Sequence, residues 1–121
     1  MDVNSLSPGA LAFVGDAYYG LLAEINRPSG ELHSLSVRLV KAGAQAAAFK
    51  LIETELSEKE LSVYKRGRNA HVNSIPKNAS VGEYHSATGL ETLFGYLHLS
   101  AQDERAEALF KIIWETCEKG E

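Results

Sequence analysis

Two acidic residues stand alone in apolar stretches of the chain. Asp16 is the only charged residue between positions 7 and 23, and Glu91 is the only acid between positions 85 and 102. Burying an ionised carboxylate in such surroundings costs free energy unless a positive group meets it. If the two stretches form helices that cross, their carboxylates could share one cation. Oxygen ligands favour hard ions such as Mg²⁺, with Mn²⁺ as a substitute.

Both acids also have a purely structural interpretation. A lone acid in an apolar run can face solvent, or it can pair with a buried Arg or Lys. Structural pairs of this kind are common enough that the pattern of Asp16 and Glu91 does not by itself decide between the two interpretations.

A basic segment lies in the middle of an otherwise acidic chain, which has 12 Lys and Arg against 16 Asp and Glu and a net charge of -4. Its cations and amides, with no acid among them, are Lys65, Arg66, Arg68, Asn69, Lys77 and Asn78. Arg and Asn donate hydrogen bonds to phosphate, and Gly67 would let a phosphate approach the backbone closely. The structural alternative is that cations near a helix end complement the helix dipole and aid solubility.

Together, the two lone acids and the basic segment would provide the groups that hydrolysis of a phosphodiester requires. A metal held by carboxylates lowers the pKa of a bound water and neutralises charge on the phosphate. A nucleophilic side chain has little support, because Cys117 lies near the end of the sequence with no evident activating partner.

Helix signals cover most of the sequence. Capping residues and apolar spacing predict helices over residues 7–26, 31–56 (with a break near Gly43), 57–69, 80–100 and 103–118. Residues 71–80 are too polar and broken for a helix and are expected to form a loop. The inward-facing residues expected in the last helix are Ala106, Leu109, Phe110, Ile113 and Trp114.

The first predicted helix carries the first acid beside a core stripe. The stripe is expected to contain Leu11, Val14, Tyr18, Leu22 and Ile25. Glycines at positions 9, 15 and 20 weaken a helix by roughly 1 kcal/mol each relative to Ala. We expect the close approach of another helix or of a ligand to compensate for them.

The class is therefore all-α, with a single compact helical domain over residues 1–121. One cysteine excludes an intrachain disulfide and zinc sites built from several cysteines. The sequence has no run of about 18 apolar residues and no signal-peptide pattern, so we expect a cytoplasmic location and no membrane partner.

Four segments, in this order and spacing, resemble the ribonuclease III family and specifically its short Mini-ribonuclease III branch. They are Leu-Ala-Phe-Val-Gly-Asp-Ala at 11–17, Lys-Arg-Gly-Arg-Asn-Ala at 65–70, Pro-Lys-Asn at 76–78 and Ala-Thr-Gly-Leu-Glu-Thr-Leu-Phe-Gly-Tyr-Leu at 87–97. The resemblance covers nearly the whole chain. It implies the helical fold of the family's endonuclease domain, with Asp16 and Glu91 as its catalytic, metal-binding acids. Full-length members carry further acids where Ala12 and Thr88 stand, and the short branch generally lacks both.

The resemblance also implies an activity and partners. It implies a homodimer whose two active sites lie along one groove and cut the two strands of an RNA duplex with Mg²⁺, leaving 5′-phosphate and 3′-hydroxyl ends. The implied substrate is the precursor of large-subunit (23S) ribosomal RNA. A ribosomal protein that helps the reaction is compatible with the resemblance. The RNA would be held by Lys65, Arg66, Arg68, Asn69, Lys77 and Asn78. We expect no double-stranded-RNA-binding domain.

Three other functions remain open at the level of sequence. The first is a non-catalytic helical RNA-binding or ribosome-assembly module that kept the fold. The second is a small all-α metal-dependent nucleotide hydrolase, although such enzymes usually have more acids at helical spacing. The third is a plain helical bundle in which Asp16 and Glu91 are surface residues.

Overall fold

A computed structural model describes residues 2–26, 42–70 and 80–119. Their helices are η1 (Val3–Ser5), α1 (Pro8–Asn26), α3 (Ala42–Ile52), η2 (Glu53–Glu55), α4 (Glu58–Arg68), α5 (Val81–Leu99) and α6 (Asp103–Lys119). No strand occurs in these residues, so the all-α prediction is confirmed. None of the helices in the described ranges is long and apolar enough to cross a membrane.

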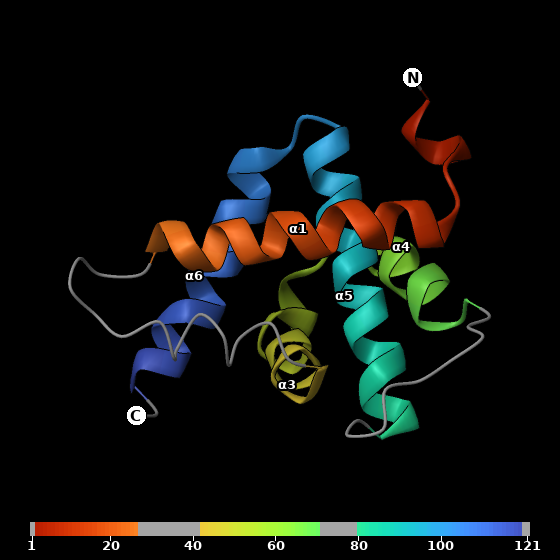
Figure 1. Cartoon of the computed structure of the whole chain (residues 1–121). Coiled ribbons are helices and arrows are strands. Elements are labelled where there is room, and N and C mark those ends of the chain that lie inside the picture. Colours follow the sequence, from red (N-terminus) through yellow and green to blue (C-terminus); the bar gives the residue numbers. More distant parts are fainter. Residues whose placement is uncertain (1, 27–41, 71–79, 120–121) are drawn as a thin grey trace.

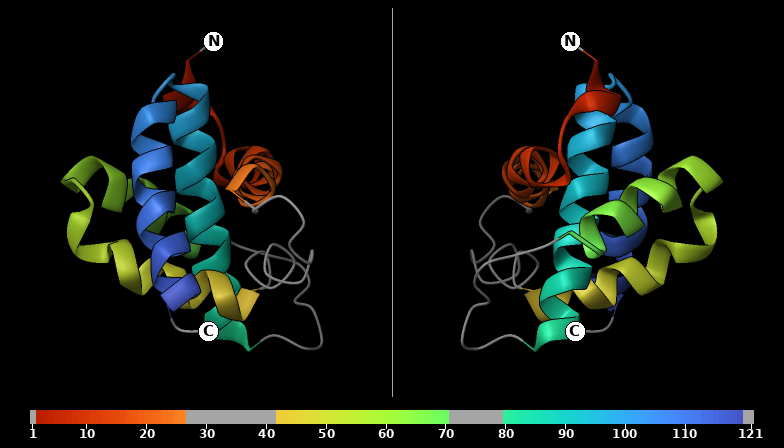
Figure 2. Two further views of the ribbon diagram at one scale, coloured as in Figure 1. Left: turned by 90° about the vertical axis from the view of Figure 1, so that its left-hand side faces the viewer. Right: turned by 90° about the vertical axis from the view of Figure 1, so that its right-hand side faces the viewer.

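Helix α5 is the central element, and it contacts α1, α3, α4 and α6. Helix α1 passes across α5, while α4 and α6 lie on opposite sides of it (Figures 1 and 2). The core between these helices is rich in aromatic residues, including Tyr19, Phe94 and Phe110. The rings of Phe94 and Phe110 both meet Tyr19 edge to face, with centroids 5.2 Å away.

Glycines allow α1 and α5 to cross with their backbones almost in contact. A Cβ added to Gly15 would lie 1.6 Å from the carbonyl oxygen of Glu91, and one added to Gly95 would lie 1.9 Å from that of Leu11. The close helix approach expected for Gly15 is therefore present. Gly9 differs, because it is exposed and a Cβ added to it would meet only Ser7 Oγ, 4.0 Å away. The crossing fixes Asp16, the next residue of α1, over the turn of α5 that carries Glu91.

A second glycine contact joins α4 to α5. A Cβ on Gly67 would lie 2.1 Å from Oγ1 of Thr92, and one on Gly89 would lie 2.7 Å from the ring of Tyr64. The expectation that Gly67 lets a phosphate approach the backbone is therefore wrong. Gly67 is buried because α5 occupies the space that a side chain at this position would fill. The basic end of α4 therefore packs against the same turns of α5 that carry Glu91.

The helix starts follow from their capping residues. Ser57 Oγ accepts the Glu60 N–H at 3.1 Å while the Glu60 carboxylate accepts the Ser57 N–H at 2.8 Å, and the two bonds together form a capping box. Ser80 Oγ accepts the Glu83 N–H at 3.1 Å at the start of α5. These bonds satisfy N–H groups that have no partner within the helix.

Arg105 ties α6 to α4 through the same glutamate. Its Nε lies 2.8 Å from Glu60 Oε2, and its Nη2 lies 2.9 Å from Glu60 Oε1 and 2.6 Å from the Glu55 carbonyl oxygen. Hydrogen bonding from Arg105 lowers the pKa of the Glu60 carboxyl. The carboxylate thus caps α4 and neutralises a cation of α6 at once.

The core positions agree with prediction in α6 and only partly in α1. All five residues expected to face inward from α6 are buried. In α1, Leu11, Tyr18 and Leu22 are buried and Val14 is half-buried, but Ile25 is 66% exposed and its assignment to the core is wrong. The last turn of α1 borders a pocket against α6, so Ile25 lines that pocket instead of packing into the core.

The predicted helix over residues 31–56 is described only from Ala42 onward. Helix α3 ends at Ile52, and the 3-10 turn η2 follows it, so the α-helix is shorter than predicted at this end. Residues 31–41 of that prediction, and residues 71–79 of the predicted loop, lie outside the described residues.

Candidate active site

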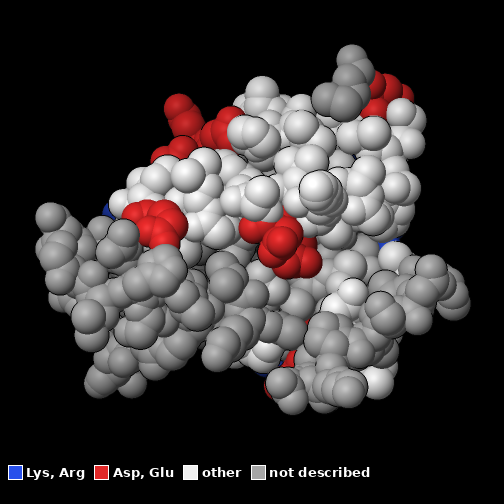
Figure 3. All heavy atoms as spheres, viewed as in Figure 1, with Lys and Arg blue, Asp and Glu red and all other residues white. Residues whose placement is uncertain are grey.

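The α1–α5 crossing brings Asp16 and Glu91 together, with their side chains within hydrogen-bonding reach of each other. Asp16 is exposed and Glu91 is half-buried. In the view of Figure 3, acidic atoms gather at the middle of the face, where α1 passes over α5. Residues 75 positions apart thus form one acidic pair.

Glu91 holds its proton more tightly than a free carboxyl group does. Burial, followed by the hydrogen bond and the negative charge of Asp16, raises the pKa of Glu91 to about 8. Two adjacent carboxylates cannot both ionise cheaply without a cation nearby. A divalent cation in place of the proton would relieve that repulsion.

The donor set fits a hard cation that keeps some of its own ligands. Carboxylate oxygens suit Mg²⁺ or Mn²⁺. Within the described ranges no group of three His, Cys, Asp or Glu side chains could hold a metal. The hydroxyl of Thr88, one turn before Thr92 on α5, donates to the Tyr84 carbonyl at 3.0 Å. Asp16 and Glu91 would therefore share the ion with water or phosphate oxygens.

A third residue at the pair was missed by the sequence analysis. Gln45 of α3 is 1% exposed, and its Nε2 donates to Oε2 of Glu91 at 3.4 Å. This hydrogen bond favours the ionised form and so opposes the rise in the pKa of Glu91. One signal was available: Gln45 is the only polar side chain among the Ala and Gly residues at positions 42–48.

Residues 65–69 of the basic segment form the last turn of α4 and its C-cap, Asn69. Arg66 Nη2 donates to the Leu6 carbonyl at 3.2 Å. Arg68 lies over the Tyr64 ring, 5.8 Å from its centroid, and its Nε donates to Asn69 Oδ1 at 3.3 Å. Arg66 and Arg68 thus also order the surrounding chain, although both remain exposed.

A pocket of about 600 Å³ runs along the basic turn of α4. It is lined by Glu58, Leu61, Ser62, Lys65, Arg66 and Asn69. Lys65 is exposed at this pocket. The predicted RNA-binding residues Lys77 and Asn78 lie outside the described residues.

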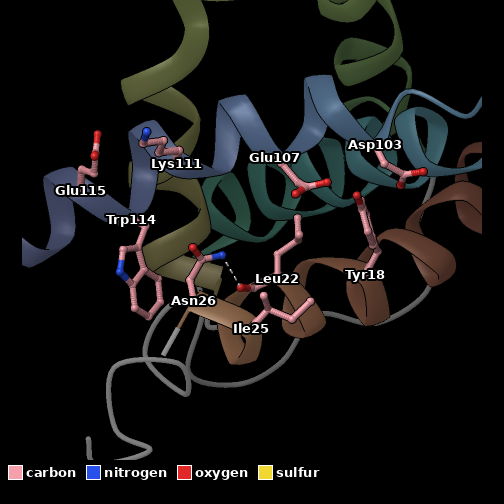
Figure 4. A pocket seen from close by; sticks show the side chains of 9 residues that line it. All are labelled: Tyr18, Leu22, Ile25, Asn26, Asp103, Glu107, Lys111, Trp114 and Glu115. Atoms are coloured by element: carbon pink, nitrogen blue, oxygen red, sulfur yellow. Dashed lines mark hydrogen bonds between the residues drawn. The ribbon is translucent and has the colours of Figure 1, made fainter. Parts of the chain in front are cut away.

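A different pocket, of about 630 Å³, lies between α1 and α6 (Figure 4). Asp16 and Glu91 do not line it, and three of its lining residues are the acids Asp103, Glu107 and Glu115. Burial, with the hydrogen bond and charge of Asp103, raises the pKa of Tyr18 here. Because acids repel phosphate, this pocket is unsuited to nucleic acid.

An apolar surface lies on α1 next to Asp16. Phe13 is 72% exposed and Leu21 is 53% exposed. With Val14, Ala17, Tyr18 and His98 they line a pocket of about 390 Å³. Large apolar side chains exposed together on one helix indicate a surface that another protein covers.

Comparison with known proteins gives consistent matches. Residues 9–102 match the Ribonuclease III domain. The chain is 42% identical to the Mini-ribonuclease 3 of Enterococcus faecalis, with 98% of both chains covered. It is 44% identical to that of Thermoanaerobacter sp., with 91% of this chain and 82% of the relative covered. The corresponding values for the Mini-ribonuclease 3 of Clostridium tetani are 39%, 93% and 79%.

The fold is similar to an X-ray structure of a protein from Fusobacterium nucleatum. The TM-score is 0.79 at 27% sequence identity, and the alignment covers 99% of this chain and 98% of the other. The similarity therefore extends over the arrangement of α1, α4 and α5 that builds the acidic pair and the basic turn.

Proposed function

From the premise that this chain belongs to the ribonuclease III family, and to its Mini-ribonuclease III branch, we propose that it is a Mg²⁺-dependent endoribonuclease acting on double-stranded RNA. The observation that carries the proposal is the pairing of Asp16 with Glu91 at a glycine crossing. The basic turn of α4 is packed on the same part of α5 through Gly67.

Each part of the site has a role in this reaction. Asp16 and Glu91 hold the cation, which when bound lowers the pKa of a water and stabilises negative charge on the scissile phosphate. Lys65 binds the RNA backbone, while Arg66, Arg68 and Asn69 bind it or order the turn that does. Lys77 and Asn78 are proposed to extend this surface. Contacts of this type read duplex RNA through phosphates and shape rather than through sequence.

The active form proposed is a homodimer. Phe13, Ala17 and Leu21 present an apolar face on the helix that carries Asp16. A second copy of the chain placed on this face would add a second acidic pair to the assembly. The strands of a duplex are related by approximate twofold symmetry, so a twofold dimer presents one site to each strand.

The biological substrate proposed is the precursor of 23S ribosomal RNA in the cytoplasm, cut to leave 5′-phosphate and 3′-hydroxyl ends. The relatives named Mini-ribonuclease 3 support a ribonuclease of this family, and the ribosomal RNA precursor is what the resemblance to the short branch implies. A ribosomal protein that shapes the RNA is the helper this proposal allows.

A second candidate function is a non-catalytic RNA-binding or ribosome-assembly module. One observation favours it: the described residues contain no third acid, His or Cys at the acidic pair. Such a module would bind duplex RNA and leave it intact at any Mg²⁺ or Mn²⁺ concentration.

Incubation of the purified chain with duplex or single-stranded RNA, in Mg²⁺ or in a chelator, tests the proposal. We expect cleavage of the duplex in Mg²⁺, and no cleavage of either RNA in the chelator. Binding of the duplex without cleavage would instead support the assembly module.

A further inference from the structure

We propose that Gln45 is a positioning residue of the site, whose buried amide holds the Glu91 carboxylate in the orientation that faces Asp16. The inference rests on the proposed function, because it assigns Gln45 to the same cation site. Gln45 comes from α3, which packs on α5. Its Nε2 lies 3.4 Å from Glu91 Oε2, and its side chain is 1% exposed.

The burial of the Gln45 amide must be offset by a hydrogen bond. An amide withdrawn from water costs free energy unless it is hydrogen-bonded, and an apolar side chain of the same volume would avoid that cost. Its neighbours Ala44, Ala46 and Ala48 are small, so Gln45 is the long polar side chain of this part of α3. The partner it reaches is Glu91, 46 residues away.

The charge of the donor distinguishes Glu91 from Glu60, which is also held by a hydrogen-bonding side chain of another helix. Glu60 is paired with the guanidinium of Arg105, which neutralises it. Glu91 receives its bond from a neutral amide. A neutral donor fixes the rotation of a carboxylate and leaves its negative charge available to a cation. An Arg or Lys at position 45 would compete with that cation.

The geometry leaves Glu91 oriented from two sides. Gln45 donates to one carboxylate oxygen, and Asp16 lies within hydrogen-bonding reach of the side chain. Loss of the amide would free the Glu91 carboxylate to rotate. Part of the binding free energy of the ion would then be used to fix the orientation of that carboxylate. Removal of a partner that orients a metal ligand typically weakens metal binding or activity about 10- to 100-fold.

The test replaces Gln45 with Met, which has a similar volume and no donor, or with Asn, which is too short to reach Glu91. The matched control is Gln102→Met, because Gln102 donates to Ser100 Oγ at 2.8 Å and does not line the acidic pair. Mn²⁺ binding is measured by calorimetry on the full chain without RNA, and the half-saturating Mg²⁺ concentration is measured for duplex cleavage.

We expect Gln45→Met and Gln45→Asn to bind Mn²⁺ at least tenfold more weakly and to need correspondingly more Mg²⁺, while Gln102→Met matches the wild type. Near-ultraviolet circular dichroism should show that Gln45→Met keeps the native fold, because the exchange conserves volume. Unchanged Mn²⁺ affinity and Mg²⁺ requirement in both Gln45 variants would overturn the assignment and leave the proposed nuclease standing. A wild-type chain that neither binds Mn²⁺ nor cuts duplex RNA would overturn both.

Discussion

At the scale of single residues, two glutamates withdrawn from solvent have opposite environments. Glu60 meets the guanidinium of Arg105 and has a lowered pKa. Glu91 meets another carboxylate, that of Asp16, and has a raised pKa. The first arrangement stabilises the fold by itself, whereas the second becomes favourable in the ionised state only when a cation arrives.

The Asp16→Asn variant tests the role of the exposed member of the pair. An amide cannot supply the negative charge that holds a divalent cation, so duplex cleavage should fall by about a thousandfold or more. The fold should be unchanged, because Asp16 is exposed. Glu107→Gln, an exposed acid lining the α1–α6 pocket, is the matched control and should cleave normally. Normal cleavage by Asp16→Asn would remove its assigned role.

The raised pKa of Glu91 predicts how the metal-free protein responds to pH. The folded state keeps the Glu91 proton up to about pH 8, whereas the unfolded chain loses it near the ordinary glutamate pKa of 4.5. This contribution to stability is thus complete below about pH 4.5 and is lost as pH rises through about 8.

The Glu91→Gln variant isolates that contribution. In a chelator at pH 8.5 it should be more stable than the wild type by about 1–3 kcal/mol, and at pH 4 the two should be nearly equal. Urea unfolding at both pH values measures the difference. If the wild type instead gained stability relative to Glu91→Gln between pH 5 and pH 8.5, the environment assigned to Glu91 would be incorrect.

At the scale of elements, the site depends on how closely α1 and α5 approach. Gly15→Ala or Gly95→Ala places a Cβ within 2 Å of a backbone carbonyl oxygen, so the helices must separate. We expect a loss of about 3 kcal/mol or more in the free energy of unfolding, with loss of cleavage. Denaturant unfolding measures it.

Gly82→Ala is the control for these two glycine variants, because nothing lies within 4 Å of an added Cβ at this position of α5. It should leave stability unchanged or raise it by up to about 1 kcal/mol. If Gly15→Ala behaved like Gly82→Ala, the helix crossing would not be the constraint inferred here.

Helix positions could be predicted because their signals are local. Ser57 and Ser80 mark helix starts within four residues of sequence, and the spacing in α6 reveals its buried face. The contact between Gln45 and Glu91 has no local signal, since it joins residues 46 apart. The Glu60–Arg105 pair also has no local signal, since its two residues are 45 positions apart. Ile25 was misassigned because a helical stripe does not reveal where the neighbouring helix stops packing.

The acidic pair itself was predictable for a different reason. A single charge in an apolar stretch is unusual, and the segments around Asp16 and Glu91 resemble the family's signature helices. Gly67 shows the limit of that approach, because a glycine beside three cations suggested a phosphate contact. The structure uses it for packing against Thr92.

At the scale of the whole molecule, the apolar face of α1 predicts the oligomeric state. Leu21→Asp places a charge on that face and should convert a dimer to a monomer, with a large loss of duplex cleavage. Val81→Asp is the matched control, because Val81 is 58% exposed at the start of α5 and does not line the α1 pocket. Light scattering during gel filtration measures the mass. A wild-type monomer, or a Leu21→Asp dimer, would contradict this use of the face.

The central claim is that Asp16 and Glu91 hold one divalent cation beside duplex RNA. Anomalous diffraction from crystals of the chain with a duplex RNA in Mn²⁺ tests it most directly. We predict a manganese peak within bonding distance of oxygens from Asp16 or Glu91, bridged by water to whichever carboxylate it does not touch. A well-ordered RNA complex in 10-fold excess Mn²⁺ that shows no peak at these two carboxylates, or a peak only elsewhere, would contradict the account.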